Sequence, residues 1–168
     1  MRPFIAIALI IILTIAAATD LQYRKIPNAV TVPAMVYGLV CHTYLSGFDG
    51  LLFSVVGTVV GLSLLLLFYI NGMMGAGDVK LMGAVGGILG PSGVFRAFLF
   101  TAMVGGIYAL IVFALKGQLI RFLKRIILSL KLTMMIRRLT LVPDEDKASP
   151  VLCYGIAIGV GTSFSLFF

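Results

Sequence analysis

The stretch Gly75-Ala76-Gly77-Asp78-Val79-Lys80-Leu81 places one carboxylate among glycines, between two apolar runs at residues 62–70 and 81–89. Removing an ionised group from water is unfavourable unless something holds it. Acids inside membrane segments are therefore functional candidates by default, and each needs a partner. The expected partner is Asp20, which ends the first apolar run of the chain. The two acids predict a carboxylate pair.

The composition around this pair is that of a membrane protein. Of 168 residues, 61% are hydrophobic and only 11% are charged, and the mean hydropathy is +1.15. We expect an all-α protein: a polytopic membrane helix bundle of about six transmembrane helices plus one basic amphipathic surface helix. Residues 1–168 are expected to form a single integral-membrane domain. The net charge of +7 fits the positive-inside rule and anionic lipid better than nucleic acid, which is not an expected partner.

Apolar runs and the turn residues between them predict where the helices lie. The fourth expected helix is too short to span the bilayer comfortably, so it is expected to be tilted, to begin deep in the bilayer or to line a cavity. The first helix has an alternative interpretation as a signal peptide with Arg2 before it and Ala16-Ala17-Ala18 as its cleavage site. We favour a membrane helix, because cleavage would discard an anchor next to Asp20. The expected helices cover residues 4–19, 29–45, 51–70, 78–89, 94–115 and 151–168.

Residues 117–139 differ from these runs, because apolar side chains recur at helical spacing and cations fill the other positions. This pattern predicts an amphipathic helix on an anionic membrane surface, with lipid headgroups as its partner. Together with the loop that follows, it would place residues 116–148 on the cytoplasmic side. The acidic run Asp144-Glu145-Asp146 in this loop is expected to be solvated.

The distribution of cations predicts the orientation of the bundle. If the loops after the first, third and fifth helices face the cytoplasm, 11 of 13 cations lie inside and only Arg2 and Arg96 lie outside. The N-terminus is then outside. This orientation places Asp20 and Asp78 at the same, cytoplasmic end of the bundle, although neither acid was used to derive it.

Two neighbouring carboxylates titrate as a coupled pair that shares a proton. One can act as a base on water while the other donates a proton to a substrate carbonyl. This chemistry requires no cofactor and no metal. The sequence also offers little for other hydrolytic sites: His42 is the single histidine, and Cys41 and Cys153 have no metal-ligand spacing and are expected to be buried apolar side chains.

Each acid also has a purely structural interpretation. Asp78 could cap the N-terminus of its helix, and Asp20 could pair with Arg24 four positions on. Capping alone does not explain the glycines around Asp78, where small residues would let a peptide backbone approach. An oligomeric state is not predicted.

The glycine-rich stretch, with Gly83, Gly87 and Gly90 after it, resembles the GxGD signature of the type IV prepilin peptidases. Asp20 followed by Ile26-Pro27-Asn28 resembles the first catalytic aspartate of that family with its downstream IPN. The resemblance implies a peptidase of the prokaryotic cytoplasmic membrane that cleaves the leader of prepilin-like proteins at the cytoplasmic face. It implies Asp20 and Asp78 as the catalytic pair. The other motif residues, expected near the substrate, are Gly75, Gly77, Lys80, Pro27 and Asn28.

The chain departs from the larger members of that family, which carry an insert with paired cysteines after the first helix and also N-methylate the product. Only about seven residues separate Asp20 from Asn28. The chain therefore resembles the compact branch associated with Flp/Tad-type pili, or the archaeal preflagellin peptidases, and methyltransferase activity is not expected. The alternative function is non-enzymatic: a proton-coupled carrier, or a pilus-assembly membrane subunit, that uses the two acids as a proton relay.

Overall fold

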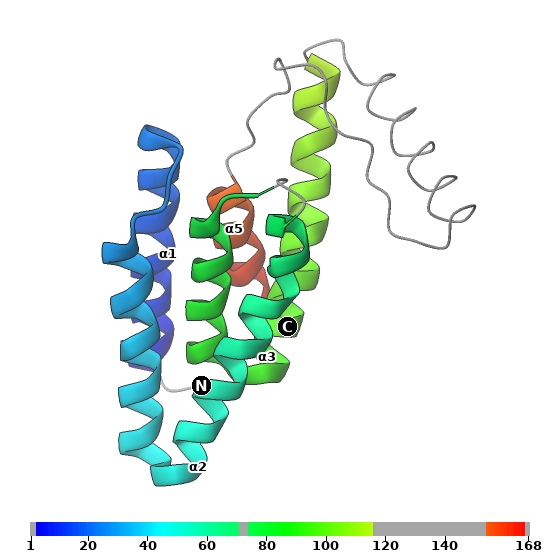
Figure 1. Ribbon diagram of the computed structural model, residues 1–168. Coiled ribbons are helices and arrows are strands. Elements are labelled where there is room, and N and C mark those ends of the chain that lie inside the picture. Colours follow the sequence, from blue (N-terminus) through cyan, green and yellow to red (C-terminus); the bar gives the residue numbers. More distant parts are fainter. Residues whose placement is uncertain (1–2, 71–73, 116–153, 167–168) are drawn as a thin grey trace, which may run out of the picture. The chain divides into compact units, whose positions relative to one another are not determined.

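The computed structural model describes residues 3–70, 74–115 and 154–166, and within these ranges it contains helices and no strands. The helices are α1 (Pro3–Tyr23), α2 (Asn28–Ile70), α3 (Ala76–Leu115) and α5 (Tyr154–Ser165) (Figure 1). The first three are long and apolar enough to cross a membrane. The all-α prediction is confirmed for this part of the chain. The predicted surface helix at 117–139, the loop that follows it and Cys153 lie outside the described residues.

The chain divides into two compact units, Met1–Gly105 with Cys153–Phe168, and Gly106–Leu152. The first unit contains α1, α2, α5 and α3 as far as Gly105.

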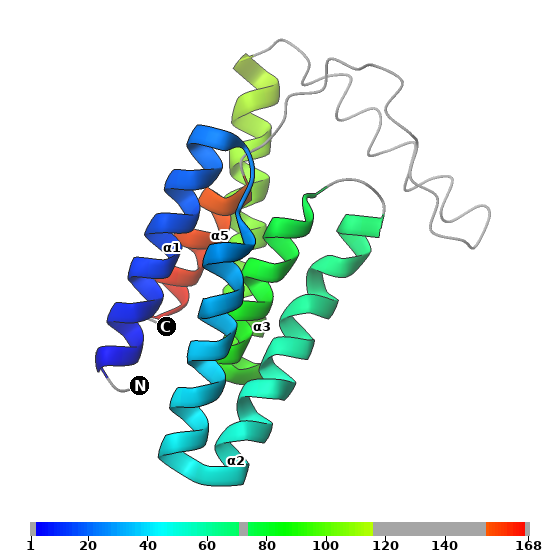
Figure 2. The ribbon, with the colours of Figure 1, turned by 60° about the vertical axis from the view of Figure 1, so that its left-hand side comes forward.

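Each of the two longest helices is broken at a glycine, as the turns expected at residues 46–50 and 90–93 predicted. The backbone of α2 breaks at Gly47 (φ 60°, ψ −133°) and that of α3 at Gly90 (φ 73°). Both positions have positive φ, which glycine adopts without the steric cost that a Cβ would impose. Figures 1 and 2 show α2 folding back on itself as a helical hairpin at this break. The helices expected at residues 29–45 and 51–70 therefore form as the two segments of α2. Those expected at residues 78–89 and 94–115 form as the two segments of α3.

The end of α1 differs from the prediction, which placed Asp20 at the helix end and a polar loop from Leu21. The helix continues to Tyr23, so Asp20 lies within its last turn. The N–H of Arg24 donates to the carbonyl oxygen of Asp20 at 2.8 Å, and Arg24 itself has a positive φ of 51°. This left-handed residue ends the helix, a role more often taken by glycine.

The first segment of α3 is the interior helix of the unit. All eight residues from Leu81 to Ile88 are buried. Both segments of α2 pack against it through six glycines, which we call the glycine seam. The short fourth helix that the sequence predicted is therefore enclosed by protein. The glycine seam consists of Gly38, Gly57 and Gly61 in α2 and Gly83, Gly86 and Gly87 in α3.

Backbones touch directly along the glycine seam. A methyl group on Gly38 would lie 2.7 Å from the carbonyl carbon and oxygen of Gly87. One on Gly57 would collide with the carbonyl oxygen of Gly86, and one on Gly61 with the carbonyl oxygen of Met82. Gly57 and Gly61 form a GxxxG pair, and this pair allows the close approach of the two helices.

Side chains of α2 complete the hydrogen bonds that are lost where α3 breaks. Pro91 has no N–H, so the carbonyl of Gly87 loses its donor four residues on. The Ser54 hydroxyl donates to that buried oxygen at 2.7 Å. Nε2 of His42 lies 2.9 Å from the carbonyl oxygen of Ile88, the next residue. The single histidine thus has a structural contact at the end of the unit away from Asp20.

The packing of α1 against α5 brings the start of α5 to the end of α1. Gly155 lies against Asp20, whereas the nearest contact of Gly159 is the carbonyl oxygen of Leu13, so the two helices run in opposite directions. The buried face of α1, with Leu9, Leu13 and Ala16, follows helical spacing. Two segments separated by more than 100 residues of sequence therefore meet at one end of the unit.

Candidate active site

The structure brings Asp20 and Asp78 together. Asp20 comes from the last turn of α1 and Asp78 from the first turn of α3, and both are buried, at 6% and 8% relative exposure. The carboxyl groups lie close enough for the charge of Asp20 to act on Asp78. Burial and mutual repulsion both make two simultaneous negative charges unfavourable. The arrangement is suited to two carboxyl groups that share one proton.

Asp78 is fixed by its own helix end. It is the third residue of α3, whereas the N-cap position belongs to Gly75, three residues earlier. The N–H of Gly75 donates to Oδ2 of Asp78 at 3.1 Å, and the N–H of Asp78 donates to the carbonyl oxygen of Gly75 at 3.2 Å. The first bond is one half of a capping box, and the second is a backbone bond, because Gly75 has no side chain to supply the other half. The first bond orients the carboxyl group against the start of the helix.

Asp20 is held by a helix that is remote in sequence. The N–H of Gly155, in the first turn of α5, donates to Oδ2 of Asp20 at 2.9 Å, and this bond is buried. Tyr154, the residue before it, lies close enough to Asp78 to interact with it electrostatically. Neither Tyr154 nor Gly155 was predicted from the sequence as a site residue. The one signal available was that the last expected helix begins at the same end of the bundle as the two acids.

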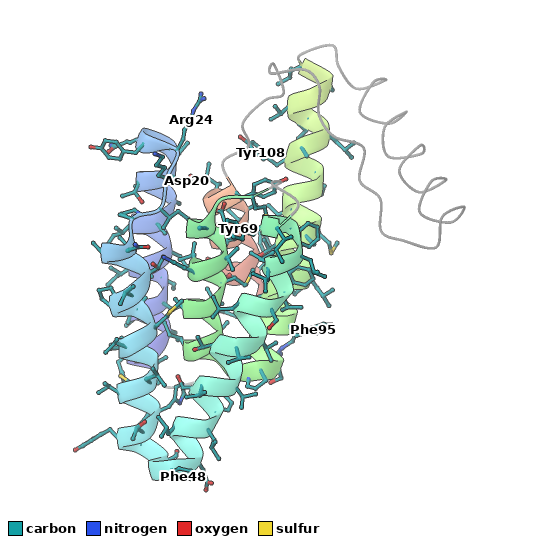
Figure 3. All side chains as sticks on the ribbon, viewed as in Figure 1. Asp20, Arg24, Phe48, Tyr69, Phe95 and Tyr108 are labelled. Atoms are coloured by element: carbon teal, nitrogen blue, oxygen red, sulfur yellow. The ribbon has the colours of Figure 1, made fainter. Side chains whose placement is uncertain are left out.

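The side chain of Arg24 does not turn back to Asp20. Figure 3 shows it extending beyond the end of α1, away from the bundle, whereas Asp20 lies within the bundle end. Arg24 is exposed to solvent. The structure therefore gives no support to the interpretation of Asp20 as the partner of this cation.

The other motif residues surround the two acids. Gly77 lies against the turn between α1 and α2, where a methyl group would be 3.0 Å from Cβ and the carbonyl oxygen of Ile26. Nζ of Lys80 donates to Oδ1 of Asn28 at 2.9 Å, which joins the N-terminal part of α3 to the first residue of α2. Gly75 is exposed.

A surface cavity of about 460 Å³ lies on this same turn. Its lining includes Pro27 and Asn28, together with Thr19, which directly precedes Asp20. The expected motif residues thus gather around one end of the unit. The full lining is Thr19, Tyr23, Lys25, Ile26, Pro27 and Asn28.

Comparison with known proteins links this arrangement to a family. The model of the type IV leader peptidase family matches residues 7–110, a range that includes both aspartates. A prepilin leader peptidase/N-methyltransferase of Bacillus subtilis (strain 168) is 29% identical over 107 residues, which cover 62% of this chain and 43% of that protein. One of Xanthomonas campestris pv. campestris is 32% identical over 123 residues, covering 70% of this chain and 43% of the relative.

These relatives are considerably longer, and the matched part of the chain corresponds to about two fifths of their length. No solved structure matches the chain significantly. The family model nevertheless covers well over half of the 168 residues. The chain therefore belongs to the type IV leader peptidase family.

Proposed function

We propose that the chain is a membrane-embedded aspartyl endopeptidase that removes the leader peptide of prepilin-like proteins at the cytoplasmic face of the prokaryotic cytoplasmic membrane. The observation that carries the proposal is the meeting of two buried aspartates from distant helix ends. Family membership supports a leader peptide as the substrate. Asp20 and Asp78 are the proposed catalytic residues.

The proposed reaction uses the proton that the two carboxyl groups share. The ionised carboxylate takes a proton from a water molecule, which attacks the carbonyl carbon of the scissile peptide bond, while the protonated carboxyl donates to the carbonyl oxygen. The tetrahedral intermediate then collapses with proton transfer to the leaving nitrogen. Gly75 N–H and Gly155 N–H hold one oxygen of each acid, so both carboxyl groups are oriented before the substrate arrives.

The proposed orientation follows from the cations. Six helical segments, two from each of α2 and α3 together with α1 and α5, are proposed to cross the membrane, with the N-terminus outside. The cytoplasmic end would then carry Asp20, Asp78 and the Lys80–Asn28 bond. A substrate backbone would approach Gly75, and the cavity on the turn between α1 and α2 would accept a neighbouring side chain.

We also propose that the chain acts as a peptidase without methylating its product. The two relatives are named for both activities, and the matched part of this chain covers 43% of each of them. The short connection from α1 to α2 leaves no room for an insert there. If a methyl donor is supplied during cleavage, mass spectrometry is expected to find the new N-terminus unmethylated.

The first prediction tests the two acids. Purified protein in liposomes should cleave a prepilin, and Asp20→Asn or Asp78→Asn should each reduce kcat by on the order of 100-fold or more, because asparagine keeps the shape but neither takes up nor releases the proton. Cleavage is measured from the mobility and N-terminal sequence of the product. Asp49→Asn is the matched control, since Asp49 is an exposed residue of α2 beside the Gly47 break. It should cleave like the parent protein.

Full activity in either asparagine variant would refute the paired-carboxylate mechanism. A parent protein that cleaves no prepilin, yet carries protons across the liposome membrane in a manner that depends on Asp20 and Asp78, would favour the carrier instead.

A further inference from the structure

Gly155 lies against Asp20 both through its backbone N–H and on the side where another residue would carry a side chain. The N–H of Gly155 lies 2.9 Å from Oδ2 of Asp20. A methyl group on Gly155 would lie 2.9 Å from that same oxygen, 3.0 Å from Cβ and 3.2 Å from Cγ of Asp20. Real Cβ atoms almost never approach other atoms so closely. A residue with a side chain at position 155 must therefore displace the carboxyl group of Asp20, or the start of α5 must move.

Asp20 accepts a hydrogen bond from another helix. It lies in the last turn of α1, where the backbone presents carbonyl oxygens and the negative end of the helix dipole. The first turn of α5 presents the opposite: N–H groups with no acceptor in their own helix. The antiparallel packing of α1 and α5 places one of these N–H groups on Oδ2 of Asp20.

The same turn of α5 also reaches the second acid. Tyr154 lies close enough to Asp78 to interact with it electrostatically, and the next residue, Gly155, donates a hydrogen bond to Asp20. The region that matches the family model ends at residue 110, before α5 begins.

We propose that Gly155 is a positioning residue for the reaction: its N–H orients the carboxyl group of Asp20, and its lack of a side chain allows α5 to come within hydrogen-bond distance. This inference rests on the proposed function, since it assigns Gly155 to the same carboxylate pair. Gly155 acts through Asp20 and does not itself touch the reacting bond.

The kinetic test compares two glycines of one helix. Gly155→Ala is expected to lower kcat for prepilin cleavage by about 10- to 100-fold with little change in KM, because a misplaced group costs rate more than substrate binding. Gly159→Ala is the control. Gly159 is also buried in α5, but a methyl group there would meet only the carbonyl oxygen of Leu13, at an ordinary 3.8 Å. It should retain the kinetics of the parent protein.

A second measurement leaves Gly155 intact and needs no cleavage. In the full-length protein in nanodiscs, the backbone amide resonance of Gly155 should shift between the parent protein and Asp20→Asn, since the acceptor of its hydrogen bond changes. The Gly159 resonance should stay in place.

The outcomes separate this inference from the proposed function. Gly155→Ala with parental kcat, or a Gly155 resonance unchanged in Asp20→Asn, would overturn it. If the Gly155→Ala protein does not accumulate in the membrane, the inference is tested by the Gly155 amide resonance, compared between the parent protein and Asp20→Asn. If the parent protein cleaves no prepilin but the resonance shifts, the proposed function fails while the contact stands.

Discussion

Gly77 determines how closely the first turn of α3 approaches the turn between α1 and α2. Its Cα faces Ile26, with 3.0 Å left between a methyl group and the carbonyl oxygen or Cβ of Ile26. Asp78 is the next residue, so its position depends on this approach. The glycine had suggested room for a substrate backbone, whereas the neighbour that the structure shows is the backbone of this chain. Packing therefore accounts for Gly77, and we propose the exposed Gly75 as the glycine that a substrate approaches.

A graded pair of substitutions at Gly77 tests this role. Gly77→Ala requires a shift of a few tenths of an ångström and should reduce kcat moderately. Gly77→Val should reduce it by on the order of 100-fold, because a displacement of about 1 Å near the reacting groups can cost that much. The measurement is prepilin cleavage at equal protein abundance. Equal activity of the valine and parent proteins would show that the space beside Ile26 does not set the position of Asp78.

At the scale of the elements, α2 and α3 depend on each other where α3 breaks. Pro91 removes one backbone donor, and the interior position of the segment keeps water from replacing it. Ser54 supplies the missing donor from the facing helix. A hairpin of α3 at Gly90 is thus stabilised by a hydroxyl group of α2.

Removing that hydroxyl group should destabilise the protein without touching the acids. Ser54→Ala leaves the buried carbonyl of Gly87 without its donor and should lower the free energy of unfolding by about 0.5–2 kcal/mol. Ser63→Ala is the control: its exposed hydroxyl donates within its own helix to Val59, and its loss should cost less than about 0.5 kcal/mol. Unfolding in mixed micelles with increasing denaturing detergent measures both values. The same cost for the two variants would contradict the proposed role of Ser54.

At the scale of the whole molecule, the proposed orientation places the Gly47 turn outside and the acids inside. In a protein with Cys41→Ser and Cys153→Ser, a cysteine replacing Phe48 should react with a membrane-impermeant maleimide in intact cells. Phe48 is exposed at the turn of the α2 hairpin, at the opposite end from Asp20 (Figure 3). A cysteine replacing the exposed Tyr23, near Asp20, should react only after permeabilisation. If the cysteine at position 23 reacts in intact cells and the one at position 48 only after permeabilisation, the topology is the inverse of the proposed one and the proposed site lies outside.

The sequence predicted those features that depend on neighbouring residues. Gly47 and Gly90-Pro91 indicated the breaks in α2 and α3, and the apolar runs indicated the helices between them. The alternation of helix direction then predicted that Asp20 and Asp78 share one end. Local patterns did not predict that Arg24 would end α1 in a left-handed conformation, because residues with side chains rarely adopt it.

Contacts between remote segments were not predictable in the same way. Gly155 donates to Asp20 across 135 positions of sequence. Hydropathy shows that the last helix exists, but it does not show which helix lies beside it. The choice of α1 as the neighbour of α5 depends on side-chain shape along both helices, which a single sequence does not reveal. The part of the site most difficult to predict is therefore the part that α5 contributes.

The glycine seam also limits how a membrane-anchored substrate can reach the acids. Backbone lies against backbone from Gly38 and Gly57 to Gly86 and Gly87, so neither a lipid chain nor another helix fits between α2 and this segment of α3. A protein sliding sideways through the bilayer cannot enter along that boundary. The boundary between α2 and α3 is therefore closed to it, and we propose that the leader reaches the acids over the ends of α1 and α3, where Asp20 and Asp78 lie.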